Sequence, residues 1–282
     1  MKKILIIGKN SFIGQSFIKH AQTRNYDFVI EEISSRDDQW KSIDFGQYDT
    51  IYHVAGIAHN SSDSKLKDLY YNVNRDLTIE VAKKAKQDGA KQFVFMSSMI
   101  VFGTKNSKIT KETIPNPDNF YGDSKLQAEN GILPLQSEDF NVAIIRPPMV
   151  YGKGSKGNYP KLAKLAKKTP IFPDYDNKRS MIHIDNLMEC ISKVIELNLS
   201  GYFHPQNEEY VKTSNLVREI AKVQNHKVVT TKLFNPIINL FKKINVVNKV
   251  FGDLYYEKDL STINNVSYII NNFESSIKYT EQ

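Results

Sequence analysis

The first fourteen residues, MKKILIIGKNSFIG, constrain the fold of this chain more than any other stretch. Residues 4–7 form a wholly apolar run that is too short for a helix, which favours a strand buried on both faces of a parallel sheet. Gly8 follows at once, and a helical pattern begins at Gly14. Free backbone N–H groups and the helix dipole converge at such a turn and attract anions. The stretch therefore predicts the first strand–turn–helix unit of a dinucleotide-binding fold.

One position of this loop departs from the dinucleotide fingerprint. Ser11 stands where the fingerprint has its middle glycine, and an ordinary turn with a glycine at each end is the alternative. We interpret Ser11 as a tolerated small residue whose hydroxyl could donate to a phosphate. The residues expected to bind the cofactor here are Gly8, Ser11, Phe12, Ile13 and Gly14.

The composition is that of an ordinary soluble globular protein. Its 282 residues suffice for one large or two small domains. The single cysteine, Cys190, excludes an intrachain disulfide and a thiolate zinc cluster, and we expect it to be buried and no metal to be bound. We expect neither a signal peptide nor a membrane-spanning helix, so the cytoplasm is the default location. The net charge of +7 suits anionic ligands such as nucleotides, whereas no nucleic-acid-binding motif is found.

Apolar strands alternate with helices along the first half of the chain. This alternation predicts an α/β fold, a Rossmann-type doubly wound parallel sheet with ligands at the carboxyl ends of its strands. We expect residues 1–150 to form the NAD(P)-binding domain, with later segments near 179–205 completing the sheet. Residues 151–282 would form mostly a small α/β substrate-binding part. The expected strands are 4–7, 27–33, 49–56, 92–96 and 201–205, and the expected helices are 14–21, 70–86, 119–129, 162–165, 187–197 and 213–223.

The end of the second strand should meet the adenosine ribose, about 20 positions past the glycines. Glu32 could accept hydrogen bonds from both ribose hydroxyls, which favours NAD(H). Alternatively, Ser34 and Arg36 could contact a 2′-phosphate, which favours NADP(H). The serine–serine–arginine run and Lys9 tilt the expectation slightly towards NADP(H), and surface polar residues at a strand end are the third interpretation.

The third strand ends in small residues, Ala55 and Gly56, which would let the backbone approach a bound cofactor without a Cβ in the way. His59 follows in a loop, where a solvated histidine is expected rather than a catalytic one.

Tyr121 and Lys125 are spaced i, i+4 and therefore share one face of a helix. A nearby ammonium favours the phenolate and would lower the pKa of a tyrosine, so that it can exchange a proton with an alcohol or carbonyl oxygen. A serine hydroxyl from the end of the strand at 92–96 can hold the same oxygen. A solvated helix pair is the alternative, but the position after a serine-ended strand favours catalysis.

Four stretches beyond the glycine loop carry a resemblance: SSMIVFG at 97–103, YGDSK at 121–125, IIRPPMVYG at 144–152 and RSMIHIDNL at 179–187. Together they resemble the extended short-chain dehydrogenase/reductases, which include nucleotide-sugar epimerases, dehydratases and reductases. The resemblance implies that Ser98 and Tyr121 are catalytic. It implies that Lys125 supports Tyr121 and binds the nicotinamide ribose, and that Pro148 lies on the cofactor. Homodimers are common in this superfamily, so a homodimer is left open.

The same resemblance implies a UDP-sugar substrate. Asn158 resembles a residue that binds the pyrophosphate, Phe172 one that packs near the nucleotide base, and Arg179 one that clamps the diphosphate. The alternatives are a turn asparagine, a core phenylalanine and a surface arginine.

Departures from the family pattern narrow the expected activity. Met99 and Ile100 stand where 4,6-dehydratases carry an acidic pair, and Met149 stands where many epimerases have an asparagine. The RPPMVYG form and the short C-terminal part resemble the reductases of UDP-4-keto-6-deoxy-N-acetylhexosamine in capsule and O-antigen synthesis. We therefore expect a NAD(P)H-dependent 4-ketoreductase. The alternative is a UDP-hexose or UDP-HexNAc 4-epimerase with tightly bound NAD. A non-catalytic cofactor sensor is disfavoured because it needs no acid/base.

Residues 233–251, LFNPIINLFKKINVVNKVF, are apolar and basic. We expect them to pack on the small substrate-binding part. Closure over the substrate and a peripheral position at the inner face of the membrane are left open.

Overall fold

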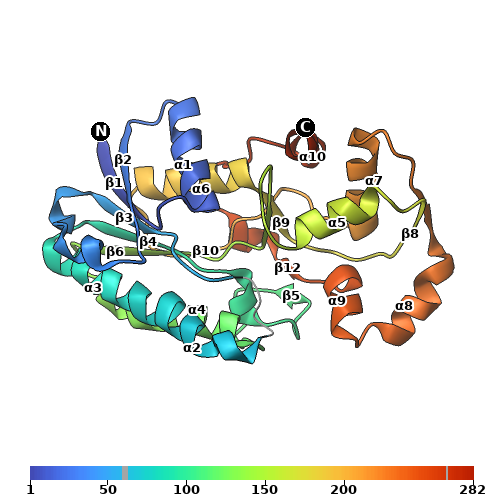
Figure 1. Ribbon diagram of the computed structural model, residues 1–282, viewed down its shortest axis with the longest axis horizontal. Coiled ribbons are helices and arrows are strands. Elements are labelled where there is room, and N and C mark those ends of the chain that lie inside the picture. The colour runs from blue at the N-terminus through green and yellow to red at the C-terminus, as the bar shows by residue number, and fades with distance from the viewer. Residues whose placement is uncertain (59–62, 265) are drawn as a thin grey trace.

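The structure, a computed structural model, describes residues 1–58, 63–264 and 266–282, so His59 lies outside the described part of the chain. Its centre is a six-stranded sheet in the order β10-β6-β4-β3-β1-β2, with every pairing parallel (Figure 1). The predicted doubly wound sheet is thereby confirmed. Its strands are β1 (Lys2–Ile7), β2 (Phe28–Ile33), β3 (Thr50–His53), β4 (Gln92–Met96), β6 (Asn141–Ile145) and β10 (Gly201–Phe203).

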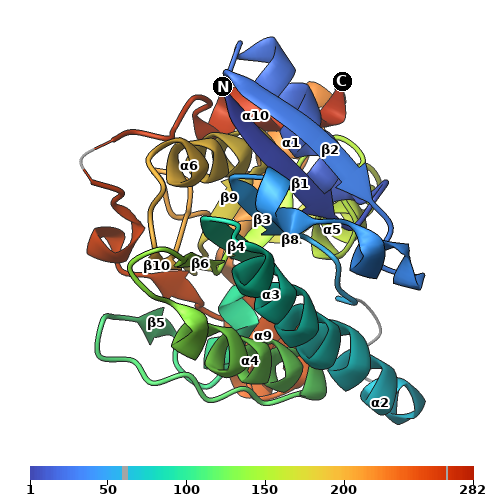
Figure 2. The same cartoon turned by 90° about the vertical axis from the view of Figure 1, so that its left-hand side faces the viewer.

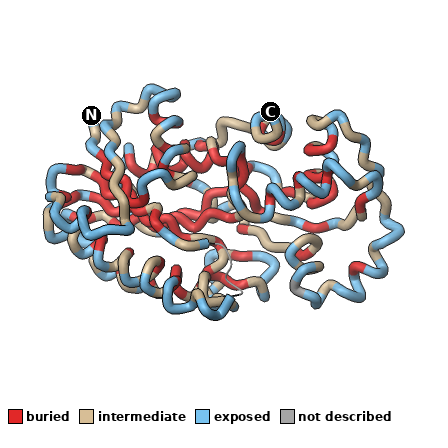
Figure 3. The backbone as a smooth tube through the Cα atoms, in the orientation of Figure 1, coloured by how far each residue is buried: buried red, intermediate tan, exposed pale blue. Residues whose placement is uncertain are grey.

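Helices cover both faces of this sheet (Figure 2). The side chains of Ile4 and Ile6 belong to the core under one face, and those of Leu5 and Ile7 to the core under the other. This explains why the first strand is wholly apolar, since successive side chains of a strand point to opposite faces. The buried residues accordingly concentrate along the sheet (Figure 3). The covering helices are α1 (Phe12–Thr23) and α6 (Ile184–Glu196) on one face and α3 (Leu77–Asp88) and α4 (Phe120–Ile132) on the other.

A late segment completes the sheet. Strand β10 pairs with β6, and the Gln92 side chain in β4 donates to the carbonyls of Val194 and Leu199 at 3.0 and 2.9 Å. Cys190 in α6 is fully buried. The first and second halves of the chain therefore share one core.

The rest of the chain forms a smaller body with its own core. Its short parallel strand pairs join residues far apart in sequence. They are β7 (Met149–Tyr151) with β9 (Met181–His183), β8 (Ile171–Pro173) with β11 (Val229–Thr231), and β5 (Lys108–Ile109) with β12 (Tyr255–Tyr256). Its helices are α5 (Asn158–Ala166), α7 (Thr213–Val223), α8 (Asn235–Phe241), α9 (Asn245–Phe251) and α10 (Phe273–Glu281).

The largest local difference from expectation lies in the predicted helix 70–86. The structure has α2 (Lys67–Tyr70), then a π-helical turn at Tyr71–Asp76, and then α3. A π turn places one extra residue in the helix, and such turns often occur at functional sites. Here it carries Asn74 inward.

Candidate active site

The glycine loop lies between the carboxyl ends of β1 and β3. Gly8 has a φ of +128°, and a Cβ there would lie 2.9 Å from the Ala55 backbone nitrogen. A Cβ at Gly14 would lie 2.8 Å from the Ser11 hydroxyl oxygen. Gly8 thus lets the loop pack against the segment after β3, Gly14 leaves space for the Ser11 hydroxyl, and α1 begins beside them with its N-terminus. This cradle fits a dinucleotide pyrophosphate.

Ser11 has a structural role that explains why it can replace a glycine. Its hydroxyl oxygen accepts a hydrogen bond from the Gly14 N–H at 3.1 Å and so caps α1, whose first two residues are Phe12 and Ile13. A hydroxyl that accepts this bond can still donate its own hydrogen.

The end of β2 brings Glu32 to the glycine loop. One Glu32 carboxylate oxygen accepts from the Asn10 N–H at 3.3 Å and from the Gln15 side chain at 2.7 Å. Arg36 is exposed, and its backbone N–H donates to the Ser34 hydroxyl at 3.1 Å. The Glu32 carboxylate therefore contacts the glycine loop, whereas Arg36 lies beyond the end of β2.

The loop after β3 packs against α4, the helix that carries Tyr121 and Lys125. A Cβ at Gly56 would lie 3.0 Å from the Lys125 ammonium and 3.1 Å from the Asn74 side-chain oxygen. Asn74 also bonds both backbone groups of Ile57, at 2.8 and 3.0 Å, and its amide donates to Ser124 at 3.1 Å. The buried side chain of Asn74 thus links the loop after β3 to α4.

Tyr121 and Ser98 meet at the carboxyl edge of the sheet. Their hydroxyl groups share a hydrogen bond, which lowers the pKa of Tyr121, but burial has the larger effect and raises that pKa to about 12. The Ser98 hydroxyl oxygen also accepts from the Ile100 N–H at 3.3 Å, which orients it. Two hydroxyl groups therefore lie close enough together to hydrogen-bond to one oxygen atom of a ligand.

Lys125 is buried on the same helix, and its ammonium donates to the Met96 carbonyl at 2.8 Å. Burial lowers its pKa to about 7, against an opposing effect of Glu129. The expected lowering of the Tyr121 pKa by Lys125 is not what this structure has, because burial of the phenol dominates. The sequence argument considered only the charge and not the cost of removing a phenolate from water.

The residues expected on the substrate side fall into two groups. Asn158 and Arg179 line a narrow pocket of about 20 Å³ together with Met149 and Lys249. The Arg179 guanidinium donates to the Gly252 carbonyl at 3.0 Å, so it links this pocket to the end of α9. Phe172 instead is only 4% exposed and packs in the core against Phe251, at 5.8 Å between ring centroids. Pro148 is buried between β6 and β7, directly before β7.

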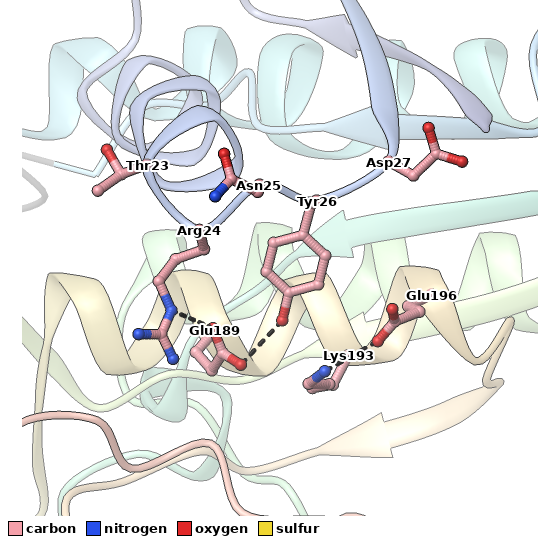
Figure 4. A pocket seen from close by; sticks show the side chains of 8 residues that line it. All are labelled: Thr23, Arg24, Asn25, Tyr26, Asp27, Glu189, Lys193 and Glu196. Carbon is pink, nitrogen blue, oxygen red and sulfur yellow. Dashed lines mark hydrogen bonds and ion pairs between the residues drawn. The ribbon is translucent and has the colours of Figure 1, made fainter.

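A larger hollow of about 570 Å³ lies elsewhere, between the C-terminal end of α1 and α6 (Figure 4). The polar groups in it pair with one another: Tyr26 donates to Glu189 at 2.8 Å, and Lys193 lies 2.9 Å from Glu196. It is far from the residues at the carboxyl ends of the strands. Within the described ranges, no cluster of three or more histidine, cysteine or acidic side chains could hold a metal ion.

Sequence reasoning gave no role to Glu129 or Arg146. Both are buried, they form an ion pair at 2.6 Å, and Glu129 also accepts from the hydroxyl of Ser97, next to Ser98. The available signal was Arg146 at the end of the apolar run VAII, because a buried arginine requires a carboxylate partner.

Comparison with known proteins connects this geometry to a family. The model of the NAD dependent epimerase/dehydratase family matches residues 4–204. A UDP-glucose 4-epimerase of Vibrio cholerae is 29% identical, with 90% of this chain and 86% of that protein covered. An N-acetyl-alpha-D-glucosaminyl-diphospho-ditrans,octacis-undecaprenol 4-epimerase of Escherichia coli O157:H7 is 25% identical, with 89% and 82% covered. A dTDP-4-dehydrorhamnose reductase of Clostridium acetobutylicum superposes with a TM-score of 0.74 at 20% identity, with 99% and 98% covered, a likeness of fold alone.

Proposed function

The chain belongs to the NAD-dependent epimerase/dehydratase family, and we propose that it is a 4-epimerase of a UDP-hexose or UDP-N-acetylhexosamine that keeps NAD bound. The observation that carries the proposal is that both sequence relatives described above are 4-epimerases matched over more than four fifths of their own length. The reductase favoured from sequence rests on Met149 and the short C-terminal part, and these weigh less than the relatives. A 4-ketoreductase with the same catalytic residues stays the second candidate, because a reductase shares the fold.

Two observations support NAD as the cofactor. The Gly8 and Gly14 turn at the start of α1 suits a pyrophosphate. The Glu32 carboxylate suits a ribose with a free 2′-hydroxyl, and it would repel a 2′-phosphate. NAD, when bound, would accept a hydride from C4 of the sugar and return it to the opposite face.

The chain's own residues would handle the proton and hold the sugar oxygen. Ser98 would hold the C4 oxygen by a hydrogen bond while Tyr121 takes the hydroxyl proton and later returns it. Lys125 would hold the cofactor ribose, and its charge would favour the phenolate once water has left the site. The 4-keto sugar would stay bound through its diphosphate while its ring rotates and presents the opposite face of the ketone.

Two residues of the second half would hold the diphosphate. Asn158 and Arg179 line one pocket, and a guanidinium matches the geometry of phosphate oxygens. We infer the same division for the chain as a whole, with residues 1–150 binding the cofactor and residues 151–282 mostly binding the substrate. Phe172 would then support the base only from within the core, since it is buried.

The deciding experiment separates epimerase from reductase in one preparation. An epimerase should purify with NAD and interconvert UDP-glucose and UDP-galactose, or their N-acetylated forms, without added cofactor. The assay should include N-acetylglucosamine joined to a polyprenyl diphosphate, the substrate type that one relative's name states. Consumption of NADH or NADPH only with a 4-keto sugar nucleotide would favour the reductase instead.

Variants test the catalytic assignment within the same assay. Tyr121→Phe should lower kcat by roughly 10²–10⁴-fold while leaving sugar-nucleotide binding in place. Tyr48→Phe is the matched control, since it removes a phenol that donates to Glu31 on the rim of the sheet, away from Ser98. Full activity of Tyr121→Phe would remove Tyr121 from the mechanism.

A further inference from the structure

Residues 232–251, which include α8 and α9, form a surface that the proposed function does not use. We call it the α8–α9 surface. Seven of the large apolar side chains that the described residues expose fall within residues 233–246. Leu240 is 76% exposed and Val246 is 72% exposed. The seven side chains are Leu233, Phe234, Ile237, Leu240, Phe241, Ile244 and Val246.

Helix α8 is apolar on both of its sides. Ile238 points inward and is only 6% exposed, whereas Ile237 and Leu240 point outward. One apolar side is enough to hold a helix on its own protein. The outward apolar side chains of α8 are therefore not needed for that purpose and are available to a partner. A contiguous exposed apolar patch rimmed by polar residues marks an interaction site. The expectation that these residues simply pack on the small part is therefore met only for the inward side.

The charge of the α8–α9 surface identifies what covers it. Residues 227–252 contain five lysines and no acidic residue. Lys232, Lys243 and Lys249 are exposed. Lys242 is half-buried with its ammonium 5.2 Å from the Tyr175 ring centroid, so it sits at the rim. Apolar side chains among lysines match a bilayer with anionic headgroups. The apolar side chains would insert at the boundary of the acyl chains, and the headgroup phosphates would attract the lysines.

A second copy of the chain fits this surface poorly. In a two-fold dimer this lysine-bearing patch would pack on a second copy of itself, and residues 227–252 supply no carboxylate to pair with the lysines. No helix within the described residues is long and apolar enough to cross a membrane. We propose that the α8–α9 surface docks the protein reversibly on an anionic lipid bilayer.

The position of the surface gives this docking a consequence. Helices α8 and α9 lie at the end of the molecule away from the six-stranded sheet (Figure 1). Lys249 and Val250 of α9 also line the pocket that contains Asn158 and Arg179. A docked molecule would thus hold that pocket close to the headgroups and the glycine loop towards the solvent. The docking itself is independent of which sugar the enzyme converts.

Vesicle sedimentation tests the proposal with the full chain. The protein should sediment with vesicles of phosphatidylglycerol and phosphatidylethanolamine, not with phosphatidylcholine alone, and added salt should release it. Leu240→Ser with Val246→Ser, and separately Lys242→Glu with Lys243→Glu, should each weaken binding at least about tenfold. All these side chains lie outside the catalytic residues, so activity on a water-soluble sugar nucleotide and the thermal midpoint should stay unchanged.

Matched controls come from the α2 end of the molecule. Lys65→Glu with Lys67→Glu reverses two exposed charges there, and Leu69→Ser removes a side chain that is 47% exposed. Both controls should bind vesicles within about twofold of the original protein. The proposal is overturned if the original protein ignores phosphatidylglycerol vesicles at low salt, or if the controls lose as much binding. It is equally overturned if the original protein does not bind vesicles and light scattering shows that it forms a dimer which Leu240→Ser with Val246→Ser dissociates.

Discussion

The Nη2 atom of Arg146 lies 2.6 Å from Oε2 of Glu129, in an ion pair whose two side chains are almost completely buried. A second bond joins the Arg146 Nε atom to the other carboxylate oxygen at 3.1 Å. Glu129 follows Lys125 by one helical turn, so this buried carboxylate pairs with Arg146 and also acts electrostatically on Lys125.

Replacing that carboxylate should be costly. Glu129→Gln leaves Arg146 as a buried charge without a counter-ion, so we expect the free energy of unfolding to fall by about 3–5 kcal/mol. Urea titration measures it. Glu80→Gln is the control, because it breaks an ion pair with Lys41 that is about half exposed and should cost less than about 1 kcal/mol. Equal losses in the two variants would show that burial gives the Glu129 pair no special weight.

The cofactor preference should follow one side chain. Glu32→Ala should weaken NAD binding by roughly ten- to a hundredfold, because hydrogen bonds to a charged group are lost, and should bring NADP binding closer to that of NAD. Calorimetry on protein stripped of nucleotide measures both affinities. Glu31→Ala is the matched control, since this exposed neighbour accepts from Tyr48 instead of facing the glycine loop. Tighter binding of NADP than NAD by the original protein would return the role to Arg36.

The glycine loop should not tolerate a single methyl group. Gly8→Ala combines a strained φ of +128° with a Cβ 2.9 Å from backbone, so cofactor binding should be lost and stability reduced. Gly89→Ala separates the two effects, because its φ is +95° but no described atom lies within 4 Å of its Cβ. We expect the control to cost about 1–2 kcal/mol and to bind cofactor normally. Fluorescence titration with NADH and thermal unfolding give the two readouts.

Acid should destabilise the protein partly through His53. Burial, aided by the charge of Lys125, lowers its pKa to about 3. An unfolded histidine binds a proton near its usual pKa of about 6.5, so stability falls as the pH drops from there towards 3.

His53→Gln should therefore flatten the dependence of unfolding free energy on pH between about 6 and 4 by about one proton. His204, whose pKa burial also lowers to about 3, should keep its share of the slope. Urea titrations across this range measure the effect, and His226→Gln, at a half-buried surface position, serves as the control. An unchanged slope in His53→Gln would show that His53 is protonated in the folded state.

The parts of the fold that could be predicted are those with a local signal. A strand buried on both faces must be apolar throughout, so residues 4–7 identify an interior strand of the sheet. The two-residue strands β5 and β12 carry no such periodicity, and they pair across about half of the chain length. Their pairing follows from the packed whole and not from either segment.

The site divides in the same way. The i, i+4 spacing of Tyr121 and Lys125 is visible in the sequence, although their roles stay predictions until variants are assayed. The register of β2 against β1, which pairs Glu32 with Ile6, brings Glu32 close to the glycine loop, and this register cannot be read from the sequence. Glu129 and Arg146 are 17 residues apart and meet only because α4 packs on the sheet.

The late position of β10 and α6 in the sequence has a consequence for folding while the chain is synthesised on the ribosome. A nascent chain that has reached residue 150 already holds five of the six parallel strands, yet one sheet face is covered by α1 and still lacks α6. Ile145 and Val94 on that face lack the part of their core that α6 supplies until residues 184–195 emerge. During that interval the growing polypeptide presents the kind of surface that chaperones bind, and the two halves become stable together rather than in turn.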